Sequence, residues 1–375
     1  MPEYRRYELG SVCARLSSGK GIPASQVFNE GAFPVYGGNG LRGYTDHSNF
    51  RGDCAIIGRQ GAFCGNVRYF NGEAYMTEHA VVVCANECHN TRYLAYLLSQ
   101  MNLGRLSGQS AQPGLSVKTL AKQVIELPPL DVQNKVVAVL SSLDSKIALN
   151  EKINDNLEQQ AQAIYHERFE TVSPNDLPSD WRIVTLGEVA TISNKSFNPL
   201  KEPEILLEHY SIPAFDEARF PVFELSTSIK SNKFIIDASC FMISKLNPTT
   251  KRVWKPYCLT GNAVCSTEFI VYKAKDKTIT DFLYSVIDSN SFSDFMCSHV
   301  TGSTGSRQRT TPSDTLSYEL ILPSEDELAE FQSLVSPMYA QMRINAIESD
   351  KLKRLRDSLL PKLMSGEIDV SSVHL

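Results

Sequence analysis

The stretch that decides the fold of this 375-residue chain lies at residues 143–157 and reads LDSKIALNEKINDNL. It belongs to a longer tract in which apolar side chains recur at alternating spacings of four and three residues, the pattern of a coiled-coil seam. The pattern predicts one long helix over about residues 130–169, with two polar layers where Asn150 and Asn154 replace apolar residues. The apolar seam positions are Val136, Leu140, Leu143, Ile147, Leu157, Ala161 and Ile164.

A second tract, at about residues 326–363, repeats this pattern, and its polar layers are Asn345 and Ser349. Asn150 and Asn345 are 195 residues apart. We expect the two helices, each about 57–60 Å long at 1.5 Å per residue, to pair antiparallel, so that Asn150 meets Asn345 or Ser349. Such a layer would fix the helix register, because misaligned asparagines face apolar residues. Pro337 should kink or interrupt the second helix. The alternative is that each helix packs only on its own globular domain.

The segments around these tracts are an internal repeat. LGSV at residues 9–12 returns as LGEV at 186–189, and VIELP at 124–128 returns as YELILP at 318–323. The repeat predicts four parts, namely a globular domain at residues 1–127, a long helix at 128–172, a second globular domain at 173–322, and a second long helix with a tail at 323–375.

The globular parts contain short β-rich runs at residues 54–58, 79–83, 234–237, 241–244 and 268–272. No regular alternation of strand and helix is visible, so we predict an α+β fold of two mixed α/β domains separated by two long antiparallel coiled-coil helices. The helices and the repeat together indicate a pseudo-two-fold arrangement.

Composition excludes several classes of protein. Hydrophobic residues make up 42% of the chain and charged residues 21%, which argues against disorder, and no apolar run is long enough for a membrane. Nine cysteines without a C-x-x-C pair, and an N-terminus without an apolar signal core, favour a reduced, cytoplasmic chain. The net charge is −5, but residues 1–127 carry 12 basic and 9 acidic side chains, so the charge does not decide on a nucleic-acid partner.

Signatures of catalysis are missing from the sequence. There is no G-x-x-x-x-G-K-[ST] loop and no H-E-x-x-H, and the only Pro-Pro, at residues 128–129, lacks the context of a methyltransferase tetrapeptide. Cys84, Cys88 and His89 are close in sequence, but no second pair of matching spacing completes a zinc site. We therefore predict no catalytic residue, no metal site and no cofactor in this chain.

The turns of both globular parts are rich in side chains that bind nucleic acids. Arg and Lys pair with guanine edges or phosphates, Asn and Gln pair with adenine, and hydroxyl groups bind phosphate oxygens. The candidates for DNA binding in the first domain are Lys20, Tyr36, Asn39, Arg42, Tyr44, Arg59, Gln60, Arg68, Gln109 and Gln112. Those in the second domain are Lys195, Lys245, Asn247, Arg252, Ser303, Thr304, Ser306, Arg307, Gln308 and Arg309. The alternative is that these turns are ordinary solvated loops.

The junction of domain and helix, LPPLDVQNKVV at residues 127–137, resembles the "PLPP-L-x-x-Q-x-x-I" signature of type I restriction–modification specificity subunits. Residues 143–158 are similar to the conserved helix of that family, and LLPKLMSGE at residues 359–367 resembles its closing motif. The second junction departs from the signature, because residues 322–325 lack the double proline and Gln332 lies later than the usual glutamine.

The resemblance implies two target recognition domains that each read one half of a bipartite, asymmetric site in double-stranded DNA. It also implies helices that set the spacing of the halves and bind two methyltransferase subunits, with two restriction subunits in the full complex and no membrane. S-adenosylmethionine, ATP and magnesium would belong to those partner subunits. Two rival hypotheses are a coiled-coil adaptor that never contacts DNA, and an enzyme with a degenerate site near Cys84, Cys88 and His89.

Overall fold

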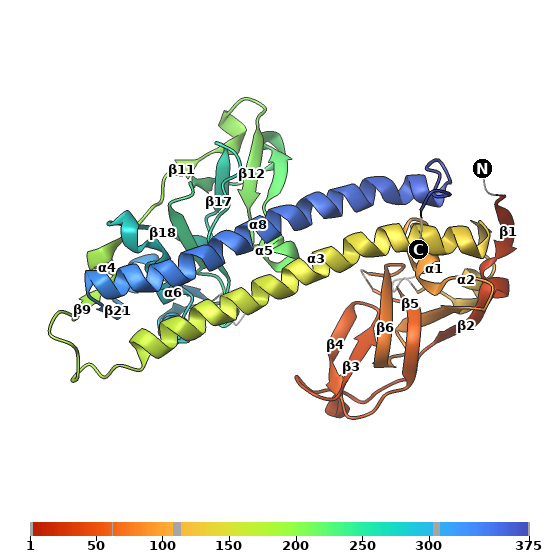
Figure 1. Cartoon of the computed structure of the whole chain (residues 1–375), viewed down its shortest axis with the longest axis horizontal. Helices are drawn as coiled ribbons and strands as arrows, with labels where there is room; N and C mark the ends of the chain where they lie inside the picture. The colour runs from red at the N-terminus through yellow and green to blue at the C-terminus, as the bar shows by residue number, and fades with distance from the viewer. Residues whose placement is uncertain (1–2, 62, 108–113, 303–307, 374–375) are drawn as a thin grey trace. The chain divides into compact units, whose positions relative to one another are not determined.

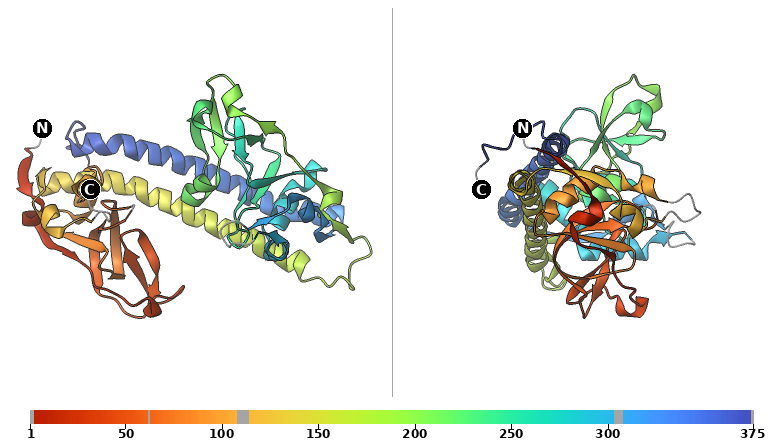
Figure 2. Two further views of the ribbon diagram at one scale, coloured as in Figure 1. Left: turned by 180° about the vertical axis from the view of Figure 1, so that it is seen from behind. Right: turned by 90° about the vertical axis from the view of Figure 1, so that its right-hand side faces the viewer.

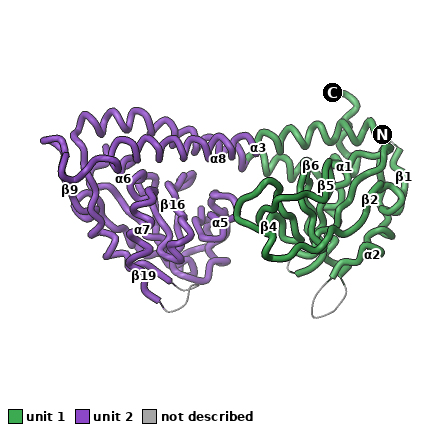
Figure 3. The backbone as a smooth tube through the Cα atoms, turned by 90° about the horizontal axis from the view of Figure 1, so that it is seen from below, with its two compact units in different colours: residues 1–147, 351–375 green, residues 148–350 purple. Residues whose placement is uncertain are grey.

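The computed structural model describes residues 3–61, 63–107, 114–302 and 308–373 (Figure 1). The chain divides into two compact units, unit 1 with residues 1–147 and 351–375, and unit 2 with residues 148–350 (Figure 3). Each unit contains one part of each long helix and one globular part. Within the described ranges, no helix combines the length and the apolar character needed to cross a membrane.

The two long helices predicted from the seam pattern are present. Helix α3 spans Leu130–Tyr165 and continues into a short π-helical segment, η4, at His166–Glu170. Helix α8 spans Glu325–Met364 and runs through Pro337 without a break, so the interruption that we expected there was wrong. Pro337 is exposed, and therefore water can satisfy the carbonyl of Ser333 that the proline leaves without a donor.

The seam also positions the helices within each unit. In unit 2, residues 148–165 of α3 and 325–350 of α8 lie side by side (Figures 1 and 2). In unit 1, Arg356 of α8 donates to Asp144 of α3 over 3.0 Å. Both helices also enter the globular cores, through Val136 and Leu363 in unit 1 and through Ala161 in unit 2. Pairing and packing on a domain are therefore both present, and are not alternatives.

The globular part of unit 1 is built on one six-stranded sheet with the order β2-β7-β5-β6-β3-β4. All neighbours in it are antiparallel except β3 and β6, which are parallel. Its strands are β2 (Cys13–Ser18), β3 (Phe33–Gly37), β4 (Gly40–Thr45), β5 (Phe50–Gly58), β6 (Val67–Met76) and β7 (Ala80–Ala85). Helices α1 (Thr91–Ser99) and α2 (Val117–Ala121) complete the domain, and a second pairing joins β1 (Arg5–Glu8) to β8 (Val124–Leu127).

The globular part of unit 2 has two sheets, with the orders β10-β18-β15-β16 and β11-β14-β17-β12-β13. The first comprises β10 (Ala190–Ile192), β15 (Cys240–Ser244), β16 (Val253–Trp254) and β18 (Phe269–Ala274). The second comprises β11 (Ser196–Phe197), β12 (Leu206–Tyr210), β13 (Val222–Leu225), β14 (Lys233–Ile235) and β17 (Ala263–Ser266). Two further pairs are β9 (Arg182–Thr185) with β21 (Glu319–Leu322), and β19 (Val300–Thr301) with β20 (Arg309–Thr310).

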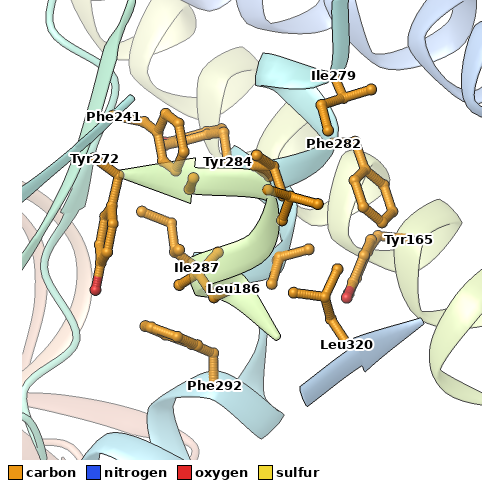
Figure 4. Packing of buried hydrophobic residues seen from close by; sticks show 14 of the residues in the cluster. Tyr165, Leu186, Phe241, Tyr272, Ile279, Phe282, Tyr284, Ile287, Phe292 and Leu320 are labelled. Atoms are coloured by element: carbon orange, nitrogen blue, oxygen red, sulfur yellow. The ribbon is translucent and has the colours of Figure 1, made fainter. Parts of the chain in front are cut away.

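Short helices and an aromatic core complete unit 2. The helices are α4 (Leu186–Val189), α5 (Ile212–Ala218), α6 (Thr280–Ile287) and α7 (Asn290–Ser298). Tyr165 of α3 lies in the same buried cluster as Phe282 of α6 and Leu320 of β21, so the long helix is part of the domain core (Figure 4). The five strands predicted from β-rich runs lie in β5, β7, β14, β15 and β18, and these predictions are confirmed.

The internal repeat is visible in the hydrogen bonding of each unit. The Leu9 amide donates to the Gln123 carbonyl over 2.8 Å, and the Leu186 amide donates to the Tyr318 carbonyl over the same distance. Leu9 and Leu186 begin the two repeated motifs, and each follows the first strand of its unit. The three neighbouring strands β2-β7-β5 in unit 1 correspond to β10-β18-β15 in unit 2.

Candidate nucleic-acid interface

The polar layer of the helix pair lies within unit 2. The Asn150 side chain is 1% exposed, and its Nδ2 donates to Glu348 Oε2 over 2.8 Å and to Ser349 Oγ over 3.3 Å. Asn345 Nδ2 donates to Asn154 Oδ1 over 2.9 Å. The predicted meeting of Asn150 with Ser349 is therefore confirmed. These bonds form in one alignment of the two helices, which is the physical basis for a role in register.

The glutamine of the family-like junction connects α3 to the globular part of unit 1. Gln133 is fully buried, its Nε2 donates to the Pro128 carbonyl over 2.8 Å, and its Oε1 accepts from the Asn90 amide over 2.9 Å. Asn90 is the N-cap of α1, whose Tyr93 amide donates to the Asn90 side chain over 3.0 Å. The signature glutamine thus fixes the beginnings of two helices against each other.

In unit 1 the structure brings several predicted residues together at the β3–β4 hairpin, residues 33–45. Gly37 and Gly40 flank its turn. A Cβ on Gly37 would lie 2.7 Å from Arg42 Cδ, and one on Gly40 would collide with the guanidinium of Arg68. Both arginine side chains therefore lie against the backbone of the turn, because glycine leaves the space for them.

Aromatic side chains continue this cluster. The Tyr36 ring lies 5.0 Å from the Phe70 ring, centroid to centroid. Burial raises the pKa of Tyr36 above its usual value, Tyr44 raises it further, and Arg68 opposes the shift. Asn39 is exposed in the turn itself. Tyr36, Asn39, Arg42, Tyr44 and Arg68 therefore form one site, although they come from β3, β4 and β6.

The other predicted residues of unit 1 lie around this site or outside the described ranges. The Arg59 amide is 3.5 Å from a Cβ placed on Gly38, and Arg59 Nη1 donates to Ser18 Oγ over 3.4 Å. Gln60 is exposed and pairs with Gly114 in an isolated bridge, and Lys20 is exposed after β2. Gln109 and Gln112 lie outside the described residues.

In unit 2 four predicted residues converge next to β15 and β20. The Asn247 amide donates to the Gln308 carbonyl over 2.9 Å, and the Thr310 amide donates to the Lys245 carbonyl over 3.1 Å. Arg309, between Gln308 and Thr310, binds both carboxylate oxygens of Glu268 at 3.0 Å. Asn247 has a positive φ of 48°, a conformation that asparagine tolerates better than most residues.

Two predicted residues of unit 2 lie apart from this group, and four are not described. Arg252 binds Asp216 with two bonds of 2.6 and 2.9 Å, and Lys195 is exposed beside β14, where its carbonyl accepts from Ile235. Because Arg252 and Arg309 already hold carboxylates, binding a phosphate or a base would require them to exchange partners. Ser303, Thr304, Ser306 and Arg307 lie outside the described residues.

Two exposed apolar side chains lie near the β3–β4 hairpin and were not among the predicted residues. Leu41 of β4 is 51% exposed and Phe28 is 50% exposed. Phe28 pairs with Tyr44 through two backbone hydrogen bonds of 2.8 Å. This pairing extends the sheet beyond β4 by a segment with no strand pattern, so no local signal marks it.

A polar cavity of about 260 Å³ in unit 2 was also not predicted. In it Lys251 Nζ lies 3.0 Å from Asp288 Oδ1, and Arg219 Nη1 donates to Glu158 Oε2 over 2.8 Å. Burial raises the pKa of Asp288 to about 6, and Lys251 opposes that shift. Across the described part of the chain, no three His, Cys, Asp or Glu side chains are arranged to hold a metal ion.

Comparison with known proteins finds relatives of this chain. Residues 1–159 match the family described as the type I restriction modification DNA specificity domain. The EcoprrI specificity subunit of Escherichia coli is 36% identical over 147 residues, which is 38% of this chain and 36% of that protein. The MjaIX specificity subunit of Methanocaldococcus jannaschii is 25% identical, over 76% of this chain and 70% of that protein. The matched part thus spans 36% of the length of the first relative and 70% of the length of the second.

The fold is shared with a solved structure. The crystal structure of the type I restriction–modification system S subunit from M. genitalium superposes with a TM-score of 0.63 at 15% identity, over 96% of both chains. The fold defines a class of proteins in which two globular parts are joined by a pair of long helices. Within that class, residues 1–159 match the type I DNA specificity domain family, and the resemblance of the chain to type I restriction–modification specificity subunits is confirmed.

Proposed function

We propose that this chain is the non-catalytic DNA specificity subunit of a type I restriction–modification complex. Each globular part would read one half of a bipartite, asymmetric target, and the pair of long helices would set the gap between the halves. The observation that carries the proposal is the repeat, since the two units share a three-strand order and the backbone hydrogen bond at the repeated motif but differ in their loops. Unlike loops on a shared frame are expected to read unlike sequences.

The partners proposed are double-stranded DNA, two methyltransferase subunits and, in the full complex, two restriction subunits. S-adenosylmethionine, ATP and magnesium would be bound by those subunits, and the complex would act in the cytoplasm. The long helices suit contacts with protein, because the two helical segments of the sequence each carry a net charge of −3 and would repel the phosphate backbone.

The experiment is to co-express the chain with the methyltransferase subunit of the same system and to sequence methylated adenines in the host DNA. We expect a motif of two unlike halves with a fixed gap. Exchange of residues 1–127 for the matching segment of another specificity subunit should change one half of the motif and leave the other intact.

A stable complex without any methylated motif would contradict the proposal. It would favour the alternative of a coiled-coil adaptor that joins proteins, to which the overall charge of −5 gives some support. The adaptor hypothesis also expects DNA affinity that disappears with added salt and shows no preference for sequence.

A further inference from the structure

The β3–β4 hairpin stands out in unit 1 by its place in the sheet. Strand β4 is the last strand in the order β2-β7-β5-β6-β3-β4, and among the described residues the Phe28 bridge alone continues the pairing beyond it. The turn reads Gly37, Gly38, Asn39 and Gly40, so its backbone carries one side chain beyond hydrogen. At Gly37 and Gly40 the missing side chains leave room for Arg42 and Arg68, so both arginines lie at the turn itself.

The two arginines at this turn have no carboxylate partner among the described residues, unlike the paired arginines of unit 2. Arg252 and Arg309 hold carboxylates in bidentate pairs. Arg42 and Arg68 are both exposed, and neither forms an ion pair with a carboxylate within the described residues. Two guanidinium groups without an acid partner at one turn create a local site for an anion or for a base edge.

An apolar side chain completes the surface. Leu41 is 51% exposed between Gly40 and Arg42, so the hairpin presents one amide, one apolar group and one guanidinium group. A second guanidinium group, that of Arg68 in β6, lies beside Gly40 at the turn. A free leucine at a protein surface needs no explanation by itself, but the charged neighbours point to one occupant. Double-stranded DNA offers phosphates and guanine edges to the arginines and thymine methyl groups to the leucine.

We infer that the β3–β4 hairpin of unit 1 enters the major groove of double-stranded DNA and reads one half of the target through Asn39, Leu41, Arg42 and Arg68. The inference rests on the proposed function and narrows it to one element. The major groove is about 12 Å wide and admits a two-stranded ribbon. Tyr36 and Phe70 lie behind the turn in ring contact at 5.0 Å and hold it against the sheet.

The test uses the full chain in its complex with the methyltransferase subunit and compares single variants. Arg42→Ala, Arg68→Ala and Leu41→Ala change the hairpin, and the matched controls are Arg6→Ala and Val124→Ala. Arg6 and Val124 are an exposed arginine and an exposed apolar residue of the β1–β8 pair, another two-stranded ribbon of the same unit. The measurements are the methylated motif in host DNA and the affinity of the purified complex for duplexes with single base changes.

We expect each arginine variant to lose about 5- to 150-fold discrimination at a base pair in one half of the motif, the range for one bidentate contact. Leu41→Ala should weaken discrimination in that same half, and both controls should leave the motif unchanged. Co-purification with the methyltransferase subunit and an unchanged melting temperature separate this result from misfolding.

Two outcomes would overturn the inference in different ways. If the parent protein yields a bipartite motif and all three hairpin variants preserve both halves, the hairpin does not read DNA and the proposed function stands. If the parent protein itself shows no sequence preference, the proposed function fails and the inference fails with it.

Discussion

At Asn345, amide groups from the two long helices complete each other's hydrogen bonding. Its Nδ2 donates to Asn154 Oδ1 over 2.9 Å, and its Oδ1 accepts from Gln341 Nε2 over 2.7 Å. The residue is buried, so the loss of these bonds leaves polar atoms without water in reach. Single side chains of this kind determine which alignment of the helices is stable.

Replacing Asn345 by alanine should therefore lower the free energy of unfolding by about 1–3 kcal/mol, because Asn154 and Gln341 lose their partner. Urea denaturation of the purified protein measures the change. Asn156→Ala, an exposed asparagine of α3, is the matched control and should change stability by less than about 0.5 kcal/mol. Equal losses in the two variants would refute a special role of the buried layer.

Asp288 makes a pH-dependent contribution to stability. Its pKa is raised to about 6 by burial, so the native state holds the proton more tightly than the unfolded chain does. Its stabilising contribution is complete below about pH 4 and is lost as the pH rises through about 6. The neutral variant Asp288→Asn should gain about 2–3 kcal/mol relative to the parent between pH 4 and pH 7.

Urea denaturation at several pH values measures this difference, with Asp180→Asn as the control. Asp180 is exposed, so its replacement should leave the pH profile of the parent unchanged. A constant difference between Asp288→Asn and the parent across the pH range would show that the pKa of Asp288 is the same in the native and unfolded states, which contradicts the shift.

Among the elements, the two long helices were predicted, the short helices were not, and the strands were predicted only in part. The apolar seam repeats over about ten helical turns, so a few polar positions do not hide its period. Helices α3 and α8 begin within one residue of the predicted positions. Strand β15 and the second half of β5 are mostly apolar runs and were found. Strand β12 was missed, because its buried residues include Glu208 and His209, whose hydrogen bonds to distant residues compensate their burial.

The candidate site was predicted by residue type but not by arrangement. Tyr36 and Arg68 are 32 positions apart in the sequence, and they come close only in the folded domain, where the strand register pairs Tyr36 with Met76 and Arg68 with Ile56. The acid partners of Arg252 and Arg309 also lie 36 and 41 positions away. Such non-local pairings leave no periodic mark in the sequence, so neither the free nor the paired arginines could be recognised from it.

Pro337 lies inside α8, which continues through it as one helix. A proline inside a helix is about 3 kcal/mol less favourable than alanine, through the missing amide and the clash with the preceding turn. Pro337→Ala should therefore raise the free energy of unfolding by about 1–3 kcal/mol, with no change in helical content. Urea denaturation and circular dichroism measure both quantities, and a lower stability would mean that the proline shapes the helix in a way that packing requires.

For the whole molecule, the pair of helices is the part whose length should control the target. Adding seven residues to α3 and seven to the facing part of α8 keeps the seam in phase and lengthens the pair by about 10.5 Å. At 3.4 Å per base pair, the gap in the methylated motif should grow by about three base pairs, and both halves should keep their bases. Sequencing of methylated adenines reads this directly.

The control for this experiment is a seven-residue insertion in α3 alone. It shifts Asn150 away from Ser349, so pairing of the helices should fail and methylation should be lost. An unchanged gap with both helices lengthened would show that the helices do not measure the DNA.

Unit 1 is assembled from two segments that are distant in the sequence, residues 1–147 and 351–375. Leu360, Leu363 and Met364 of α8 lie in the same core as Val83 and Leu94. During translation, the residues of unit 2 leave the ribosome before this core is complete, although the first residues of unit 1 are made earliest. The domain that is synthesised first therefore finishes folding last, and until then its apolar surface is one that chaperones would have to protect.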